Sequence, residues 1–187
     1  MNAPGRCRGF TLIEILVALV IVGIVVSVAL LSTNLVGNDR ELDRESRRLA
    51  ALIGVARDDA MFQGREFGIE MLSTGYRFVE FDPYTNQWAV VPDDGTLRHW
   101  ELPEGIELEL LLEDRKIRLD IEPQEIRYDP RTGASIGNYA PHLLIFSSGD
   151  MTPFEITLRR PFDNTREVLR GDLLGNLEFG DEDAAGT

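Results

Sequence analysis

A nearly uninterrupted apolar run near the start of the chain constrains what this sequence can form more than any other feature. It extends from Phe10 to Leu31, and Glu14 is the only charged residue among those twenty-two positions. A helix of that length covers about 33 Å at about 1.5 Å per residue, enough to cross a hydrocarbon core of about 30 Å. A carboxylate inside a membrane costs several kcal/mol unless it has a partner, so Glu14 is a candidate functional residue.

The residues around the start of this run resemble the N-terminal signal of the type IV pilin superfamily: Arg8-Gly9-Phe10-Thr11-Leu12-Ile13-Glu14. The resemblance implies that a prepilin peptidase cleaves after Gly9, removes residues 1–9 as a leader, and leaves Phe10 as a methylated N-terminus. An ordinary secretory signal is cut after its hydrophobic region, which is then lost. Here the cut precedes the apolar run, so we expect the helix to stay on the mature chain.

Cleavage at this position creates an α-amine at Phe10, close to the membrane depth of Glu14. The resemblance implies that Glu14 of one subunit meets the Phe10 amine of its neighbour in a filament. A low dielectric strengthens such a pair and penalises an unpaired member. The two residues are also i and i+4 on a helix, so pairing within one chain is equally compatible with the sequence.

A simpler interpretation is an uncleaved signal anchor whose Glu14 reaches the membrane interface. The starting sequence Gly-Phe-Thr-Leu-Ile-Glu is unusual for such an anchor. One position departs from the pilin pattern, since many major pilins have a proline where this chain has Leu31. We therefore expect no proline kink there.

Charge and cysteine content exclude several classes of function. The chain has 187 residues and a formal net charge of −13, which disfavours nucleic acid because such affinity comes mostly from lysine and arginine on phosphates. Its one cysteine, Cys7, lies in the expected leader, so we expect a mature chain without disulfides or cysteine metal sites. No cofactor is expected.

A second helical pattern follows the apolar run, and we expect it over residues 36–64, after a membrane or filament-core helix over 10–35. Apolar residues recur there at helical spacing, and charged residues occupy the other side. The stripe comprises Leu35, Leu42, Leu49, Ile53, Ala56 and Ala60. Gly64 is a candidate C-cap. We expect this amphipathic helix to pack on a globular domain.

Strand patterns dominate residues 65–179, which we expect to form a β-rich domain. The clearest alternation places Ile106, Leu108, Leu110 and Leu112 on one face, and its expected partner strand runs from Ile117 to Ile121 across a loop at residues 114–116. One buried and one wet face is typical of antiparallel sheets. Residues 180–187 are small and acidic, and we expect a disordered tail. The expected fold class is α+β: a long N-terminal helix packed on antiparallel sheets, as in pilins.

Two further segments resemble the minor pseudopilins called H (the GspH/FimT-like family) of type II secretion systems. One is the turn Phe146-Ser147-Ser148-Gly149-Asp150-Met151-Thr152-Pro153-Phe154, and the other is the helix with Arg57, Ala60 and Gly64 before a strand. The resemblance implies a structural subunit at or near the tip of a periplasmic pseudopilus, which helps export folded proteins across the outer membrane. It also implies the partners, namely minor pseudopilins of the I, J and K types and the major pseudopilin.

The same resemblance implies a single-pass protein of the bacterial inner membrane with its C-terminal domain in the periplasm. Basic residues alone do not decide this orientation, because Arg6 and Arg8 precede the apolar run while Arg40, Arg44 and two further arginines follow it.

Other functions have weaker support. Ser147 or Ser148 with His142 and Asp150 could suggest a hydrolase, but the segment lacks a nucleophile-elbow pattern, so we expect no catalytic residue. His99 and His142 have no metal-ligand partner at a known spacing, and Asp93-Asp94-Gly95 matches no full calcium loop. A minor type IV pilin, used for pilus assembly or DNA uptake, and a signal-anchored periplasmic enzyme remain the alternatives.

Overall fold

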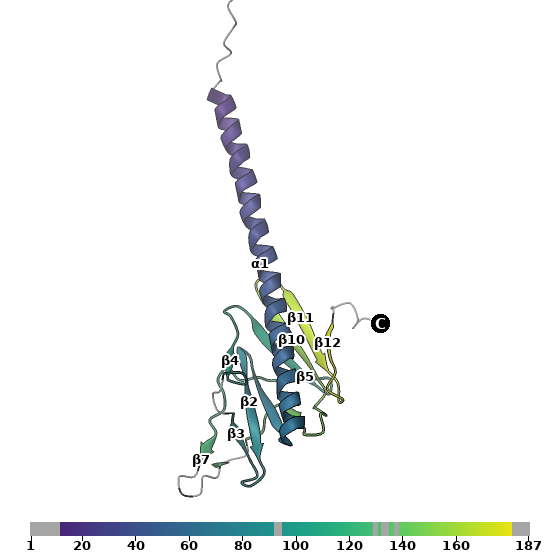
Figure 1. Cartoon of the computed structure of the whole chain (residues 1–187). Helices are drawn as coiled ribbons and strands as arrows, with labels where there is room; N and C mark the ends of the chain where they lie inside the picture. The colour runs from purple at the N-terminus through teal and green to yellow at the C-terminus, as the bar shows by residue number, and fades with distance from the viewer. Residues whose placement is uncertain (1–11, 92–94, 129–130, 132–134, 137–138, 181–187) are drawn as a thin grey trace, which may run out of the picture. The chain divides into compact units, whose positions relative to one another are not determined.

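The computed structural model describes residues 12–91, 95–128, 131, 135–136 and 139–180, and for 28–39, 128 and 135–136 it describes only the backbone. The chain divides into two units, residues 1–40 and 41–187. One helix, α1 (Leu12–Gln63), contributes to both. All the strands belong to the second unit (Figure 1).

α1 ends where the sequence predicts. Gly64 has a left-handed backbone with φ of 64°, and the Arg65 amide donates to the Ala60 carbonyl at 3.1 Å. Glycine adopts this conformation without a steric penalty, so Gly64 serves as the C-cap of the helix.

The first antiparallel sheet has the strand order β3-β2-β1-β9, with β4 also paired to β2. Its members are β1 (Phe67–Leu72), β2 (Gly75–Asp82), β3 (Gln87–Val90), β4 (Trp100–Glu101) and β9 (Leu143–Ile145). The hairpin between β2 and β3 turns through residues 83–86, which include proline and asparagine, two residues common in turns.

The second antiparallel sheet has the order β12-β11-β10-β5-β6. Its members are β5 (Glu107–Leu112), β6 (Arg115–Ile117), β10 (Phe154–Arg160), β11 (Thr165–Gly171) and β12 (Leu177–Gly180). A short separate pair consists of β7 (Arg127–Tyr128) and β8 (Ser135–Ile136).

The core lies between the part of α1 in the second unit and the two sheets. The helix stripe predicted from the sequence is buried there, with exposed fractions of 1% or less at Leu42, Leu49, Ile53, Ala56 and Ala60. Leu35 belongs to the same predicted stripe, but its side chain lies outside the described residues. The fold class is α+β, with the helix packed on antiparallel sheets, which confirms the prediction.

The hairpin formed by β5 and β6 differs from the prediction. The turn consists of Glu113 and Asp114, which have φ of 50° and 61°, so Arg115 and Lys116 belong to the strand and not to the loop. The predicted partner strand over residues 117–121 is therefore wrong, since β6 ends at Ile117. Glu109 forms cross-strand ion pairs with Lys116 of β6 at 2.7 Å and with Arg159 of β10 at 3.0 Å.

Candidate assembly surfaces

The predicted processing site lies only partly within the described structure. Gly9 and Phe10 are outside the described residues, so their predicted roles in cleavage and methylation stay predictions. Glu14 is in the first turn of α1 and is exposed in the isolated chain. Its predicted role in assembly also stays a prediction.

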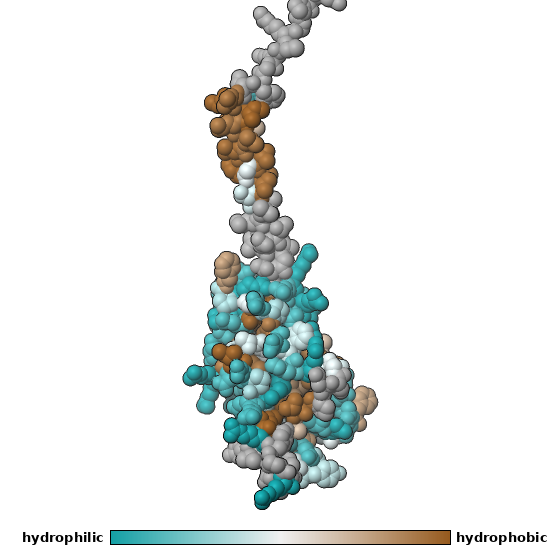
Figure 2. All heavy atoms as spheres, turned by 90° about the vertical axis from the view of Figure 1, so that its left-hand side faces the viewer, coloured by the Kyte–Doolittle hydropathy of each residue, from teal (hydrophilic) through white to brown (hydrophobic). Residues whose placement is uncertain are grey.

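Apart from Glu14, Ser27 and Arg40, the described side chains of the first unit are apolar, lie on all sides of the helix and are exposed. They include Leu12, Ile13, Leu16, Leu19, Ile21 and Val25, and Figure 2 shows them as a brown column. A helix that is apolar all round is normally covered by lipid or by other helices. Ser27 satisfies its hydroxyl within the helix by donating to the Gly23 carbonyl at 2.8 Å. The described helix contains no stretch that is both long and apolar enough to cross a membrane.

The two segments that resemble pseudopilin H meet at the end of α1 in the second unit. Arg57 donates from Nη1 to the Gly175 carbonyl at 3.0 Å. An ideal Cβ on Gly175 would lie 2.7 Å from Arg57 Nε, and one on Gly149 would lie 2.9 Å from Met61 Sδ. Both glycines also have positive φ. Arg57 therefore lies between the turn after β9 and the turn after β11, at two positions where the positive φ favours glycine.

The serine-rich turn after β9 is built by local hydrogen bonds. Ser148 donates from Oγ to Asp150 Oδ2 at 2.9 Å, and the Asp150 amide donates back to Ser148 Oγ. His142 accepts a hydrogen bond at Nδ1 from the Met71 amide at 3.1 Å. Burial lowers the pKa of His142, with Glu70 and Asp120 opposing the shift. These contacts give Ser148 a role in the turn and hold His142 against β1.

A buried ion pair on the first sheet is a feature that sequence reasoning missed. Glu70 is 2% exposed and pairs with Arg77 on β2 at 2.5 Å. Glu70 also accepts hydrogen bonds from the Gln124 amide at 2.8 Å and from Tyr139 Oη at 3.2 Å. Burial raises the pKa of Tyr139. The pair thus fixes both ends of the segment that carries β7 and β8, and no local pattern could have predicted that.

A second buried acid holds α1 to the first sheet. Glu45 is 5% exposed and accepts a hydrogen bond from Trp100 Nε1 on β4 at 3.0 Å. The guanidinium of Arg48 lies over the Trp100 ring, 3.2 Å from its centroid. Trp100 therefore packs on the core from β4 and makes a polar contact to the helix.

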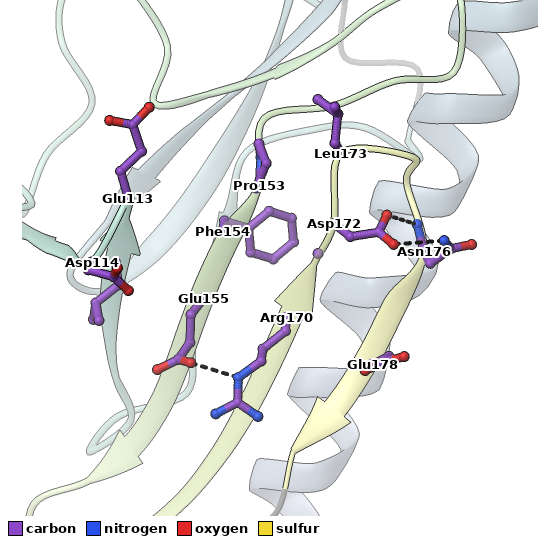
Figure 3. Close-up of a pocket in the computed structure, with 12 residues that line it drawn as sticks. Glu113, Asp114, Pro153, Phe154, Glu155, Arg170, Asp172, Leu173, Asn176 and Glu178 are labelled. Atoms are coloured by element: carbon purple, nitrogen blue, oxygen red, sulfur yellow. Dashed lines mark hydrogen bonds and ion pairs between the residues drawn. The ribbon is translucent and has the colours of Figure 1, made fainter. Parts of the chain in front are cut away.

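A groove of about 500 Å³ opens at one end of the second sheet, below the β5–β6 turn and beside the β11–β12 turn (Figure 3). Its apolar part consists of Leu111, Pro153, Phe154 and Leu173. Five carboxylates and one guanidinium also line it, which gives a formal charge of −4, from Glu113, Asp114, Glu155, Asp172, Glu178 and Arg170. The sequence carries no motif that marks this groove.

Two of these acids are engaged within the chain. Glu155 pairs with Arg170 at 2.7 Å. Asp172 accepts hydrogen bonds from the side-chain and backbone nitrogens of Asn176, which lower the pKa of its carboxyl. Within the described part of the chain, no three acidic, cysteine or histidine side chains are arranged to hold a metal ion. Asp93 and Asp94, considered above for calcium, lie outside the described residues.

Two segments of the chain match known protein families. Residues 4–30 match the prokaryotic N-terminal methylation motif, and residues 45–175 match the family described as type II transport protein GspH. The second match covers more than half of the chain, including both segments that meet at Arg57. The chain belongs to the GspH family.

Individual relatives support this membership. The chain is 36% identical to type II secretion system protein H of Pseudomonas aeruginosa, over 81% of this chain and 82% of the relative. It is 28% identical to the protein of the same name from Aeromonas hydrophila, over 93% of each chain. The crystal structure of the minor pseudopilin EpsH from Vibrio cholerae has the same fold, with a TM-score of 0.58, 19% identity, and coverage of 78% of this chain and 99% of the other.

Proposed function

We propose that this chain is a structural subunit at or near the tip of a type II secretion pseudopilus. Membership of the GspH family makes it a minor pseudopilin of a type II secretion system that associates with other pseudopilins. The observation that carries the proposal is the combination of two adjacent matches, a methylation motif over 4–30 and the GspH family over 45–175. Its partners are the I, J and K types and the major pseudopilin, and its role is structural, with no enzymatic activity.

The proposed maturation uses the first ten residues. Prepilin peptidase removes residues 1–9 after Gly9, and Phe10 becomes the methylated N-terminus. The match to the methylation motif spans both residues and the apolar run as far as residue 30.

The proposed anchoring uses residues 10–35, of which the run from Phe10 to Leu31 has one charged residue. Before assembly this segment holds the chain in the inner membrane as a single pass, with residues 36–64 and the β-rich domain over 65–179 in the periplasm. On assembly it moves into the filament core, where the exposed apolar side chains of α1 pack against other helices.

Glu14 drives that move in the proposed mechanism. Its carboxylate pairs with the Phe10 amine of a neighbouring subunit, and loss of one partner leaves the other charge unpaired in a low dielectric, at a cost of about 3–5 kcal/mol.

The test compares two substitutions in the same helix, made in the host that carries the secretion system. Glu14→Ala should leave leader removal intact and should lower the fraction of the chain recovered with sheared pseudopili by about tenfold or more. Ser27→Ala is the matched control, because the Ser27 hydroxyl is already satisfied by the Gly23 carbonyl, and should assemble normally. Normal recovery of Glu14→Ala would contradict the pairing mechanism.

A further inference from the structure

The groove at the end of the second sheet combines carboxylates that have no partner among the described residues with an apolar floor. Figure 3 shows Glu113 and Asp114 on one side of the Phe154 ring and Glu178 on the other. Within the described residues, these three carboxylates take part in no hydrogen bond or ion pair, whereas Glu155 and Asp172 are both engaged. The one guanidinium, Arg170, is held by Glu155. The groove therefore holds unneutralised negative charge around an apolar floor.

The apolar floor decides what kind of cation fits. Leu111, Pro153 and Phe154 lie among the lining residues, and Leu173 is 57% exposed at the edge. A metal ion gains nothing from an apolar floor, and the described acids are not arranged to chelate one. Arginine and lysine differ, because their aliphatic stems pack on apolar surface while their charged heads reach carboxylates.

We infer that this groove binds an arginine or lysine side chain on a loop of a neighbouring pseudopilus subunit. The inference rests on the assembly role proposed above and gives it a specific contact. Complementary charge of this kind fixes register between partners and suppresses wrong pairings. A bound cation also neutralises part of the charge of Glu113, Asp114 and Glu178, which otherwise repel one another.

The test uses the full-length chain in the host cells, with the photo-crosslinking amino acid p-benzoylphenylalanine at Leu173. The expected product is a crosslink to another pseudopilin, mapped by mass spectrometry to a peptide containing an arginine or lysine. The triple variant Glu113→Gln, Asp114→Asn, Glu178→Gln keeps the shapes of the side chains and removes their charge. It should reduce that crosslink by about tenfold.

A matched control removes equal charge elsewhere. Glu101, Glu104 and Glu122 are exposed and line a different hollow of about 410 Å³. Changing all three to glutamine should alter the crosslink by less than about twofold, since distant surface charges contribute little. Thermal unfolding of both purified triple variants verifies that they are folded.

Three results would overturn the inference while the chain still fractionates with pseudopili: a crosslink that survives neutralisation of the groove, a crosslinked peptide without arginine or lysine, or no peptide crosslink at position 173. The last is the outcome for a groove filled by a cation or a small solute. A chain that does not fractionate with pseudopili at all would instead contradict the proposed function.

Discussion

Arg57 of α1 packs beside two glycines, Gly149 and Gly175, in two turns of the β-rich domain. The side chain lies against Gly149 and Gly175, whose turns come from strands far apart in the sequence. Side-chain atoms of the helix fill the space where a β-carbon would lie. The three residues therefore act as one packing unit.

Substitution of Gly175 tests this unit. Gly175→Ala should lower the free energy of unfolding by about 2–3 kcal/mol, from a strained positive φ and from displacement of Arg57. Gly105→Ala is the control, because Gly105 also has a positive φ but an added Cβ meets no atom within 4 Å, so about 1 kcal/mol should be lost. Equal losses in urea unfolding would contradict the role of Arg57.

His142 makes stability depend on pH. Its pKa is lowered in the folded chain because it is partly buried, and its Nδ1 accepts from the Met71 amide only when unprotonated. A lowered histidine pKa gives stability that is complete above the unfolded value of 6.5 and is lost as pH falls through the folded value.

The free energy of unfolding should therefore fall as pH drops below about 6.5. His142→Gln should flatten that part of the curve, and His99→Gln, which changes the only other histidine of the chain, should leave it unchanged. An identical pH slope in wild type and His142→Gln would exclude His142 as the source.

In the β5–β6 hairpin, the sequence predicts the buried face of the strand but not the position of the turn. Alternation predicted the buried face of β5 correctly, because period-two burial is a local property. It placed the turn at residues 114–116, since Glu113 and Asp114 lack the asparagine–glycine signature of a two-residue turn. Both residues nevertheless adopt left-handed conformations, which pairing with β10 and β6 imposes.

This turn offers a stabilising substitution. Asp114→Gly should raise the free energy of unfolding by up to about 1 kcal/mol, because glycine adopts the left-handed conformation at Asp114 without strain. The change is measured by urea unfolding of the full chain. A loss of stability instead would mean that the aspartate side chain contributes more than its backbone strain costs.

The helix stripe could be predicted from the sequence, whereas the contacts of the buried acids could not. Leu42 and Leu49 were predictable because helical spacing specifies a face without knowledge of the partner. Glu70 was not, because Gln124 and Tyr139 approach it from more than fifty residues away. The groove around Phe154 was missed for the same reason, since its lining combines turns that only the sheet topology brings together.

The proposed assembly of the whole molecule depends on a processed N-terminus. Glu14 can pair with the Phe10 amine of a neighbouring subunit only if cleavage after Gly9 frees that amine. The family match to residues 45–175 defines the domain, and the proposed role of the apolar helix before it is to join that domain to the filament.

Mass spectrometry of the chain isolated from its native membranes tests this directly. The proposed maturation predicts that the most N-terminal peptide begins at Phe10 and carries one methyl group on its α-nitrogen. A peptide that still contains residues 1–9 would contradict it, and the chain would then be a domain on an uncleaved anchor.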